Sequence, residues 1–315
     1  MRCHNDQKNN GSCKAPPAER KIQNDNCVSC HMPRSGATDI PHVTVHDHYI
    51  RAIRPKTDVA QVKKFIGLYA VNDDHPSGAT KAKAYVNYYE KFDSKNSALL
   101  DSALVYLPSA TQLELKTDFQ GLVQVCFLKR DYQGIADLVS RAGKGWVLTT
   151  SLIHKNLSND DAWTAYRIGE ALHGLQKPEA IEFYQRATDL APFMLDFQSK
   201  LGIVLMELNR TEEAGKVFDF IIREDDRIAS AHTNRGRIWF VQGHYPEAKA
   251  CYDKALMLDP DNLSAMKNQV DLLITQQAYP EAKSMLNKIL KRYPEDKSAK
   301  ALLEKMKSLN LISRS

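Results

Sequence analysis

The sequence predicts an all-α protein in which an irregular N-terminal module precedes a solenoid of helical repeats. Two observations lead to this prediction. Residues of matching type recur every 34 positions through the second half of the chain. Four of the six cysteines fall within the first thirty residues, in a stretch without helical periodicity. With 315 residues, 43% hydrophobic and 26% charged, the chain can form two or three globular domains.

The 34-residue period is carried by several positions in phase. Three kinds of position share it: a helix-ending residue at Pro192, Pro260 and Pro294, with Asp226 between them; a small residue at Ala180, Ala214, Ala248 and Ala282; and a large residue at Tyr184, Phe218, Tyr252 and Leu286. Gly202 and Gly236 mark a close approach in the first helix of a unit. This period with these residue types is the signature of tetratricopeptide (TPR) repeats, which we expect over residues 161–296.

Helical patterns also flank the predicted repeats. Residues 57–142 predict a helical connector or degenerate repeats, with apolar residues at three- and four-residue spacing over 59–69, 80–92, 98–107, 118–128 and 132–140. A turn is expected at Gly143–Trp146. Residues 297–315 predict a capping helix, within 296–309, and a tail.

The most specific motif is Cys27-Val-Ser-Cys30-His31, in a module that we place at residues 1–56. Two thiols three positions apart can each form a thioether with one vinyl group of the same porphyrin, and His31 can then ligate the iron. The motif predicts one complete site for haem c. The alternatives are zinc, which needs a second cysteine pair, and a redox pair, which is expected in a βαβ pattern; the sequence has neither feature.

A six-coordinate haem iron needs a second axial ligand. His42, His46 and His48 are the candidates, and their even spacing would place them on one side of an extended strand. Met32 is a weaker candidate because it directly follows the proximal histidine.

Cys3 and His4 look like the second half of another haem motif, whose first cysteine would precede Met1. The first residues lack the apolar region of a secretion signal, although covalent haem attachment takes place outside the bacterial cytoplasm. We therefore expect the chain to be the C-terminal part of a longer periplasmic or otherwise extracytoplasmic protein, with the signal peptide lost by truncation.

The N-terminal module resembles a known family. Three runs carry the resemblance: residues 27–34, Asp39-Ile-Pro-His42 and Asp47-His48-Tyr-Ile50. They are similar to multihaem c-type cytochromes of the cytochrome c554-like group, in particular those whose haem domain is followed by TPR repeats. The resemblance covers about the first fifty residues. It implies several neighbouring haems, many with bis-histidine ligation.

The resemblance also implies roles for individual residues. The last haem site of the family is matched by Cys27, Cys30 and His31. The second half of the preceding site is matched by Cys3 and His4, so that site is partial. The family's downstream histidines, which ligate this haem or a neighbouring one, are matched by His42 and His48.

Three functions remain open from the sequence. The leading interpretation is a haem-binding electron-transfer protein whose repeats dock a redox partner protein or other haem domains. The alternatives are a TPR interaction scaffold with no functional haem and a part of a multihaem oxidoreductase. An electron carrier fits the motifs better than a catalyst, because histidines stand beside the complete haem motif.

The concave face of the repeats is expected to bind a peptide or protein. The candidate groove residues are Trp163, His232, Asn234, Arg235 and Asn268. Cys126 and Cys251 are expected to be small core residues. The net charge of +5 is spread without a dense basic run, so we expect no nucleic-acid partner. No apolar run is long enough to predict a membrane span.

Overall fold

The computed structural model describes residues 34–36, 44–46, 65, 67–70, 73–151 and 159–312. The chain separates into two compact units, residues 1–67 and 68–315. In the first unit, strand β1 (Arg34–Gly36) pairs antiparallel with β2 (Thr44–His46), and Arg34 lies opposite His46. The all-α prediction did not include a sheet, although the histidine spacing over 42–48 was that of an extended strand; β-branched Thr44 and Val45 favour the extended backbone found there.

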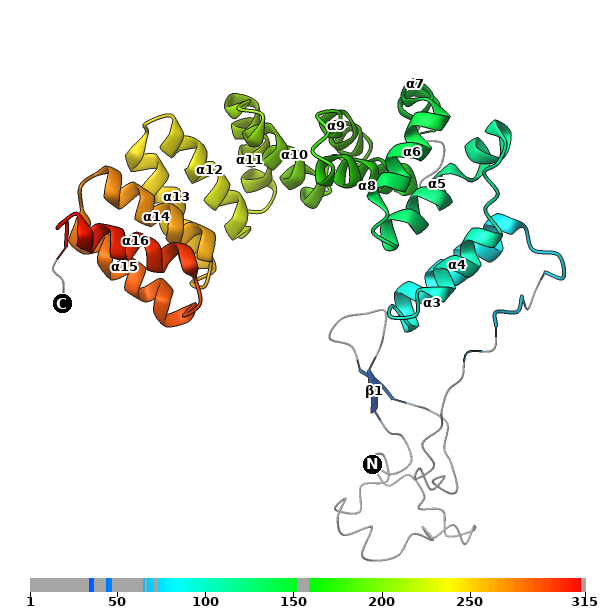
Figure 1. The fold of residues 1–315 in the computed structure, drawn as a ribbon, viewed down its shortest axis with the longest axis horizontal. Coiled ribbons are helices and arrows are strands. Elements are labelled where there is room, and N and C mark those ends of the chain that lie inside the picture. The colour runs from blue at the N-terminus through cyan, green and yellow to red at the C-terminus, as the bar shows by residue number, and fades with distance from the viewer. Residues whose placement is uncertain are drawn as a thin grey trace, which may run out of the picture. The chain divides into compact units, whose positions relative to one another are not determined.

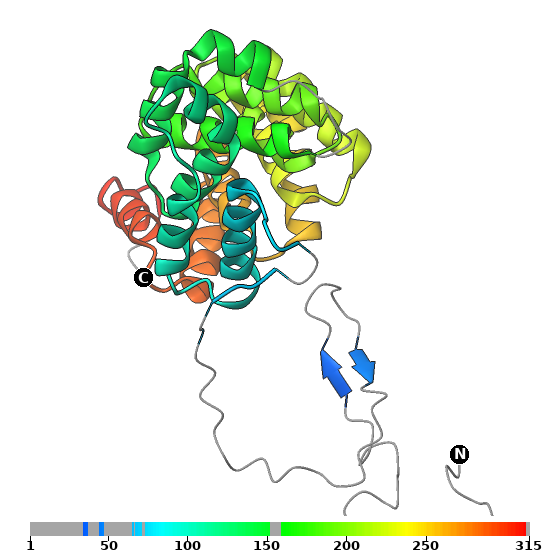
Figure 2. The same cartoon turned by 90° about the vertical axis from the view of Figure 1, so that its right-hand side faces the viewer.

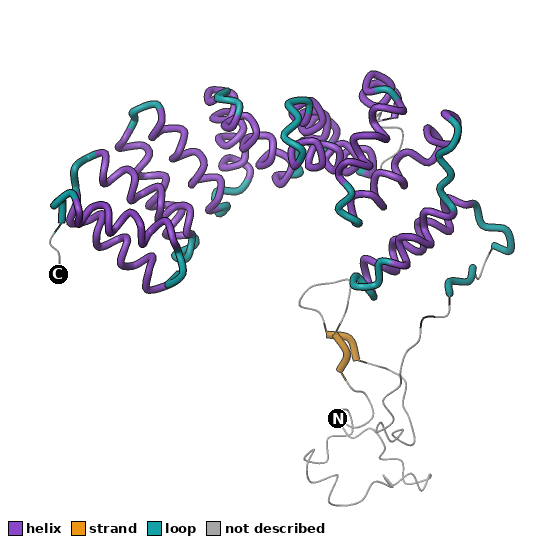
Figure 3. The backbone as a smooth tube through the Cα atoms, in the orientation of Figure 1, coloured by secondary structure: helices purple, strands orange, loops and turns teal. Residues whose placement is uncertain are grey.

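The second unit is helical, as predicted, and its helices pack as consecutive pairs (Figures 1 and 3). The pairs are α3 (Gly78–Phe92) with α4 (Ala98–Val105), α5 (Gln112–Leu128) with α6 (Tyr132–Ala142), α8 (Asp160–Gly174) with α9 (Ala180–Leu190), α10 (Leu195–Glu207) with α11 (Thr211–Glu224), α12 (Ala229–Val241) with α13 (Tyr245–Leu258), and α14 (Leu263–Thr275) with α15 (Tyr279–Arg292). Helix α16 (Lys297–Ser308) packs on α15. Figure 2 looks along this row, with the cyan and green helices nearest the viewer.

One turn geometry joins the two helices of most pairs. The second residue after the first helix is left-handed at Arg130, Gln176, Asn209, Gly243 and Gln277, with φ between 57° and 82°. In each turn the next amide donates to the carbonyl five residues earlier, as in Arg210 N to Leu205 O at 2.8 Å. This is the Schellman motif, which satisfies the free carbonyls at a helix end. The pair α5–α6 therefore turns in the same way as the pairs inside the 34-residue period.

The core explains why the period contains a glycine. A Cβ atom on Gly236 would lie 2.6 Å from the Tyr252 ring, and one on Gly202 would lie 2.7 Å from the Phe218 ring. The first helix of the unit must therefore lack a side chain where the aromatic ring of the second helix rests on it. In the unit that follows, Val270 takes the place of the glycine and Leu286 takes the place of the aromatic residue. Both side chains are buried in one cluster. A pair of medium-sized side chains thus replaces the glycine packed against an aromatic ring.

An insertion separates α6 from α8. The turn predicted at 143–146 begins with Gly143 at φ 87° and continues into a short helix, α7 (Lys144–Trp146), and a π-helical turn, η1 (Val147–Ser151). The Trp146 ring packs edge-on against Phe119 of α5 at 5.7 Å. The insertion therefore returns an aromatic side chain to the preceding helix pair.

The expected helices over 80–92, 98–107, 118–128 and 132–140 are present, with shifted ends. Helix α5 begins earlier, at Gln112, because Thr111 and Glu114 form a reciprocal capping box. The helix expected over 59–69 is wrong where it can be compared: residues 67–69 have no regular structure. Gly67 has φ 145°, which is incompatible with a helix.

Candidate functional site: a pocket between α3, α5 and α8

The predicted haem site lies outside the described residues. This applies to Cys3, His4, Cys27, Cys30, His31, Met32, His42 and His48. His46 is described only as the last residue of β2. Within the part of the chain that the structure describes, no three histidine, cysteine or acidic side chains gather as metal ligands. Haem binding and periplasmic location therefore stay predictions.

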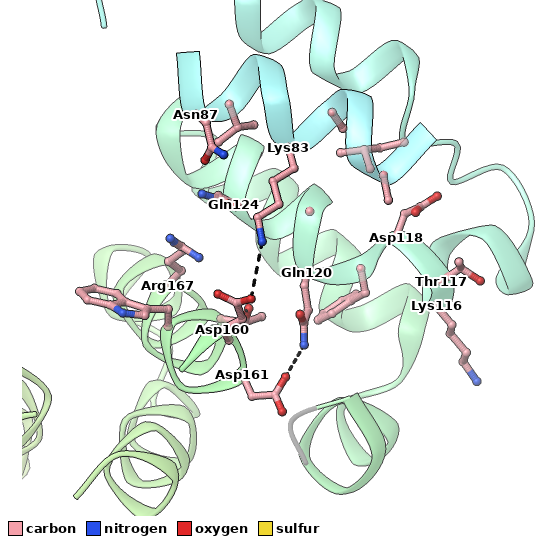
Figure 4. A pocket seen from close by; sticks show the side chains of 18 of the residues that line it. Lys83, Asn87, Lys116, Thr117, Asp118, Gln120, Gln124, Asp160, Asp161 and Arg167 are labelled. Atoms are coloured by element: carbon pink, nitrogen blue, oxygen red, sulfur yellow. Dashed lines mark hydrogen bonds and ion pairs between the residues drawn. The ribbon is translucent and has the colours of Figure 1, made fainter. Parts of the chain in front are cut away.

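A pocket of about 620 Å³ lies between α3, α5 and α8. Its walls come from three helices that are far apart in sequence (Figure 4). Trp146 of the insertion also lines it. The polar residues that line it are Lys83, Asn87, Lys116, Thr117, Asp118, Gln120, Gln124, Asp160, Asp161, Thr164 and Arg167. A concave site with convergent polar groups is the usual form of a ligand site.

Helix periodicity places these side chains in the pocket. Ala162, Ala165 and Ile168 of α8 are buried in the core. Trp163 and Arg167, one helical turn apart, consequently share the pocket side of α8. On α5, buried Leu115 and Phe119 anchor the helix in the same way.

Arg167 is a cation of the pocket that has no ion pair or hydrogen bond with a described residue. Its side chain is half-buried, and burial lowers its pKa, while Glu90 and Asp160 oppose that shift. Arginine nevertheless stays charged at any physiological pH. Neither Glu90 nor Asp160 forms an ion pair with it, and the contact found is with the Trp163 ring, whose centroid lies 5.8 Å from the guanidinium carbon. The Trp163 ring is itself held edge-on by Phe197 at 4.9 Å.

Asp118 is the least engaged anion. Burial raises the pKa of its carboxyl group, and the nearby charge of Glu114 adds to that shift. The side chain makes no hydrogen bond or ion pair with any described residue. Its neighbour Lys116 lies over the Trp146 ring, 5.0 Å from the centroid.

Apart from Lys116, the other charges of the pocket have polar partners within it. The Gln120 amide donates to Asp161, and Lys83 approaches Asp160 at 3.9 Å (Figure 4). Gln124 donates weakly to Glu90 at 3.5 Å. Arg167 and Asp118 are therefore left as opposite, unpaired charges in one pocket.

The predicted groove residues have different environments in the structure. Trp163 lines the pocket and is 36% exposed. His232 is wrong as a groove residue: it is 8% exposed, and its Nε2 donates to the Asp226 carbonyl at 2.8 Å. Gln198 makes the equivalent bond to the Pro192 carbonyl, 34 residues earlier, at 3.0 Å. This position therefore ties a helix to the loop before it.

Arg235 also binds other residues of the protein rather than facing a groove. Its side chain is 12% exposed, forms a two-point contact with Asp219 at 2.6 and 3.1 Å, and stacks on Trp239. The equivalent residue in the next unit, Gln269, donates to Asp253 at 2.9 Å. Both contacts join a first helix to the preceding second helix, so Arg235 does not serve the groove.

Asn234 and Asn268 remain available. Both are half-buried, and neither side chain has a hydrogen-bond partner among the described residues. Cys126 and Cys251 are half-buried rather than fully buried. Burial raises the pKa of both thiols, that of Cys126 to about 11, so neither is a thiolate near neutral pH.

The pocket residues other than Trp163 were not identified from the sequence. The Thr111-x-x-Glu114 signature would have fixed the start of α5. No sequence signal places Asp118 and Arg167 together, because they lie in helices separated by an insertion.

None of the helices within the described residues is long and apolar enough to cross a membrane. Sequence profiles of the tetratricopeptide repeat match residues 199–262 and 241–306. Among curated proteins, mouse (Mus musculus) protein O-mannosyl-transferase TMTC1 is 33% identical over 103 residues, which are 31% of this chain and 11% of that protein. The matched stretch thus spans about a tenth of TMTC1.

Among solved structures, PilF of Pseudomonas aeruginosa has a TM-score of 0.51 at 16% identity, covering 73% of this chain and all of that chain. YrrB, described as a TPR protein with an unusual peptide-binding site, has a TM-score of 0.45 at 24% identity, over 60% of this chain and 91% of its own. The likeness to PilF shows the fold alone. With the profile matches, it establishes that residues 199–306 are tetratricopeptide repeats, a fold suited to protein–protein interaction.

Proposed function

We propose that the protein is an interaction scaffold that binds an extended segment of a partner protein in the pocket between α3, α5 and α8. The observation that carries the proposal is the set of polar side chains left without partners around this pocket. They include Arg167, Asp118 and the amide of Asn87, none of which bonds to a described residue. Polar groups left unpaired on rigid helices are positioned to bond a ligand rather than the protein itself.

The side-chain chemistry favours a peptide over a small metabolite. Amides donate and accept at once, as the backbone of an extended peptide requires. Asn87, Asn234 and Asn268 all present free amides from the first helices of their pairs. The exposed Trp163 ring lines the same pocket as Asn87 and offers an apolar surface there. A peptide could thus be bonded along its backbone while one apolar side chain rests on Trp163.

Binding to an array of synthetic peptides tests this proposal. We expect a subset of peptides to bind with micromolar affinity, and we expect Trp163→Ala to weaken these peptides about tenfold, since an aromatic anchor commonly dominates such interfaces. Lys288→Gln is a matched control, because Lys288 is exposed on α15 and lines no part of the pocket. Binding that is absent, or equal in Trp163→Ala and the wild type, would contradict the proposal.

A second candidate function is haem-based electron transfer outside the cytoplasm, because Cys27, Cys30 and His31 form a complete haem c motif. The thiols would anchor the porphyrin, His31 would be the proximal ligand, and His42 or His48 the distal one. Cys3 and His4 would belong to a second site completed upstream. A bound haem would supply one-electron chemistry, and the repeats would dock the redox partner.

Expression in a host that attaches haem c tests the second candidate. We expect the intact mass of the exported chain to rise by one haem and a haem-stained band to disappear in Cys27→Ser/Cys30→Ser. The matched control is Cys126→Ser, because Cys126 lies in the helical unit. An exported chain with the mass of the bare polypeptide would rule out this function.

A further inference from the structure

We propose that the pocket binds the partner segment in one chain direction only. In that direction, an acidic side chain of the partner pairs with Arg167, and a basic side chain pairs with Asp118. This inference rests on the proposed function. It adds the charge pattern of the partner and the polarity of its docking.

The first argument is that these two charges form no ion pair or hydrogen bond with a described residue, while Lys116, the other cation without one, lies over the Trp146 ring. The remaining carboxylates of the pocket are engaged, Asp160 by Lys83 at 3.9 Å and Asp161 by the Gln120 amide. Arg167 and Asp118 have no such partner among the described residues. An acidic group added at Arg167 and a basic group added at Asp118 would give each of these charges a partner.

The second argument is their placement. In the close view, Arg167 lies beside Gln124 and Asn87 on one side of the pocket, and Asp118 lies on the other side, with Lys83 and Gln120 between them (Figure 4). The two charges are therefore separate subsites, one on α8 and one on α5. A ligand that carries both signs can satisfy both subsites in one orientation only.

The third argument is that each subsite is partly desolvated. Burial lowers the pKa of Arg167 and raises the pKa of Asp118, so both charged forms have lost hydration. A charged partner restores the lost interactions through short, charge-assisted hydrogen bonds. The reversed ligand would instead place like charges together, and such juxtaposition provides specificity by repulsion.

The test compares peptides of identical composition in which a Glu and a Lys exchange places, with spacers of increasing length between them. We expect one order to bind about tenfold more tightly at the optimal spacer, which corresponds to about 1.4 kcal/mol. Arg167→Gln and Asp118→Asn should each reduce this preference. The double variant Arg167→Asp/Asp118→Arg should reverse it. Lys288→Gln, which removes an exposed charge on α15 outside the pocket, should preserve the preferred order.

The outcomes separate the two proposals. Binding of both orders with equal affinity would overturn the directional inference and leave the scaffold function standing. Binding of neither order, together with an empty peptide array, would overturn both. If the double variant does not give the helical circular-dichroism spectrum of the wild type, the two neutral single variants decide: a preference unchanged in both overturns the inference.

Discussion

The regular repeats of α10–α15 and the helices around the pocket use similar turns but differ in what their side chains do. In the regular repeats, polar residues at matching positions bond to the protein, as Arg235 does to Asp219 and Gln269 does to Asp253. Around the pocket, Arg167 and Asp118 bond to no described residue. The comparison teaches that polar side chains in the helices of these repeats serve two purposes: Arg235 and Gln269 hold neighbouring helices together, whereas Arg167 and Asp118 are available to a ligand.

The largest effect on stability is expected at Gly236, where the two helices of a repeat are in close contact. Gly236→Ala should destabilise the fold by about 2 kcal/mol, because its Cβ would lie 2.6 Å from the Tyr252 ring and overpacking outweighs the gain in helix propensity. Gly145→Ala is the matched control, since a Cβ there meets nothing within 4 Å, and it should be neutral or slightly stabilising. Urea unfolding measures both.

A compensating change sharpens this prediction. Adding Tyr252→Leu to Gly236→Ala should recover part of the lost free energy of unfolding, because it recreates the medium-sized pairing of Val270 with Leu286. If the double variant is no more stable than Gly236→Ala alone, the close contact with the ring is not the cause of the destabilisation.

Smaller effects on stability are expected from substituting Tyr184 and Tyr252, which occupy the same position of their units. The Tyr184 hydroxyl donates to Glu170 at 2.6 Å, whereas the buried Tyr252 hydroxyl has no hydrogen-bond partner among the described residues. Tyr184→Phe should cost about 1.5 kcal/mol of unfolding free energy. Tyr252→Phe should be neutral or stabilising by up to about 1 kcal/mol, since it removes an unpaired buried hydroxyl. Equal losses in thermal or urea unfolding would contradict the contrast.

The cap of the repeats should respond to acid. Lys267, the Ala299 amide and Ser298 all donate to the Asp296 carboxylate and lower its pKa from 3.8 to about 2. Its contribution to stability is therefore complete above its unfolded pKa and is lost as the pH falls toward 2. Asp296→Asn keeps a good N-cap and should flatten the stability profile in this window. An unchanged profile in urea titrations from pH 5 to pH 2 would contradict this prediction.

The smallest effect on stability is expected in the pocket. Arg167→Gln and Asp118→Asn should each change the free energy of unfolding by less than about 0.5 kcal/mol, because neither residue has a hydrogen bond or ion pair with a described residue that would be lost. The same two variants should change peptide preference. A loss of stability as large as that of Tyr184→Phe would place these residues with the structural contacts of the repeats.

The difference between the two regions also decides what could be predicted from the sequence. The packing of Ala214 or Phe218 follows from the period, because the same neighbours recur at fixed separations. His232 was misplaced because its partner is a backbone carbonyl, that of Asp226, which no side-chain pattern reveals. The pocket was missed because its walls meet through tertiary packing of α3, α5 and α8 across an insertion.

The repeated turn has a consequence for engineering the chain. Asn209, Gly243 and Gln277 stand at equivalent places, and each leaves its helix with the same left-handed backbone. A cut made at the same position of two such units joins ends that already have matching geometry. Units of 34 residues could therefore be removed or duplicated between Leu195 and Arg292 as interchangeable parts, lengthening or shortening the array without redesigning a junction.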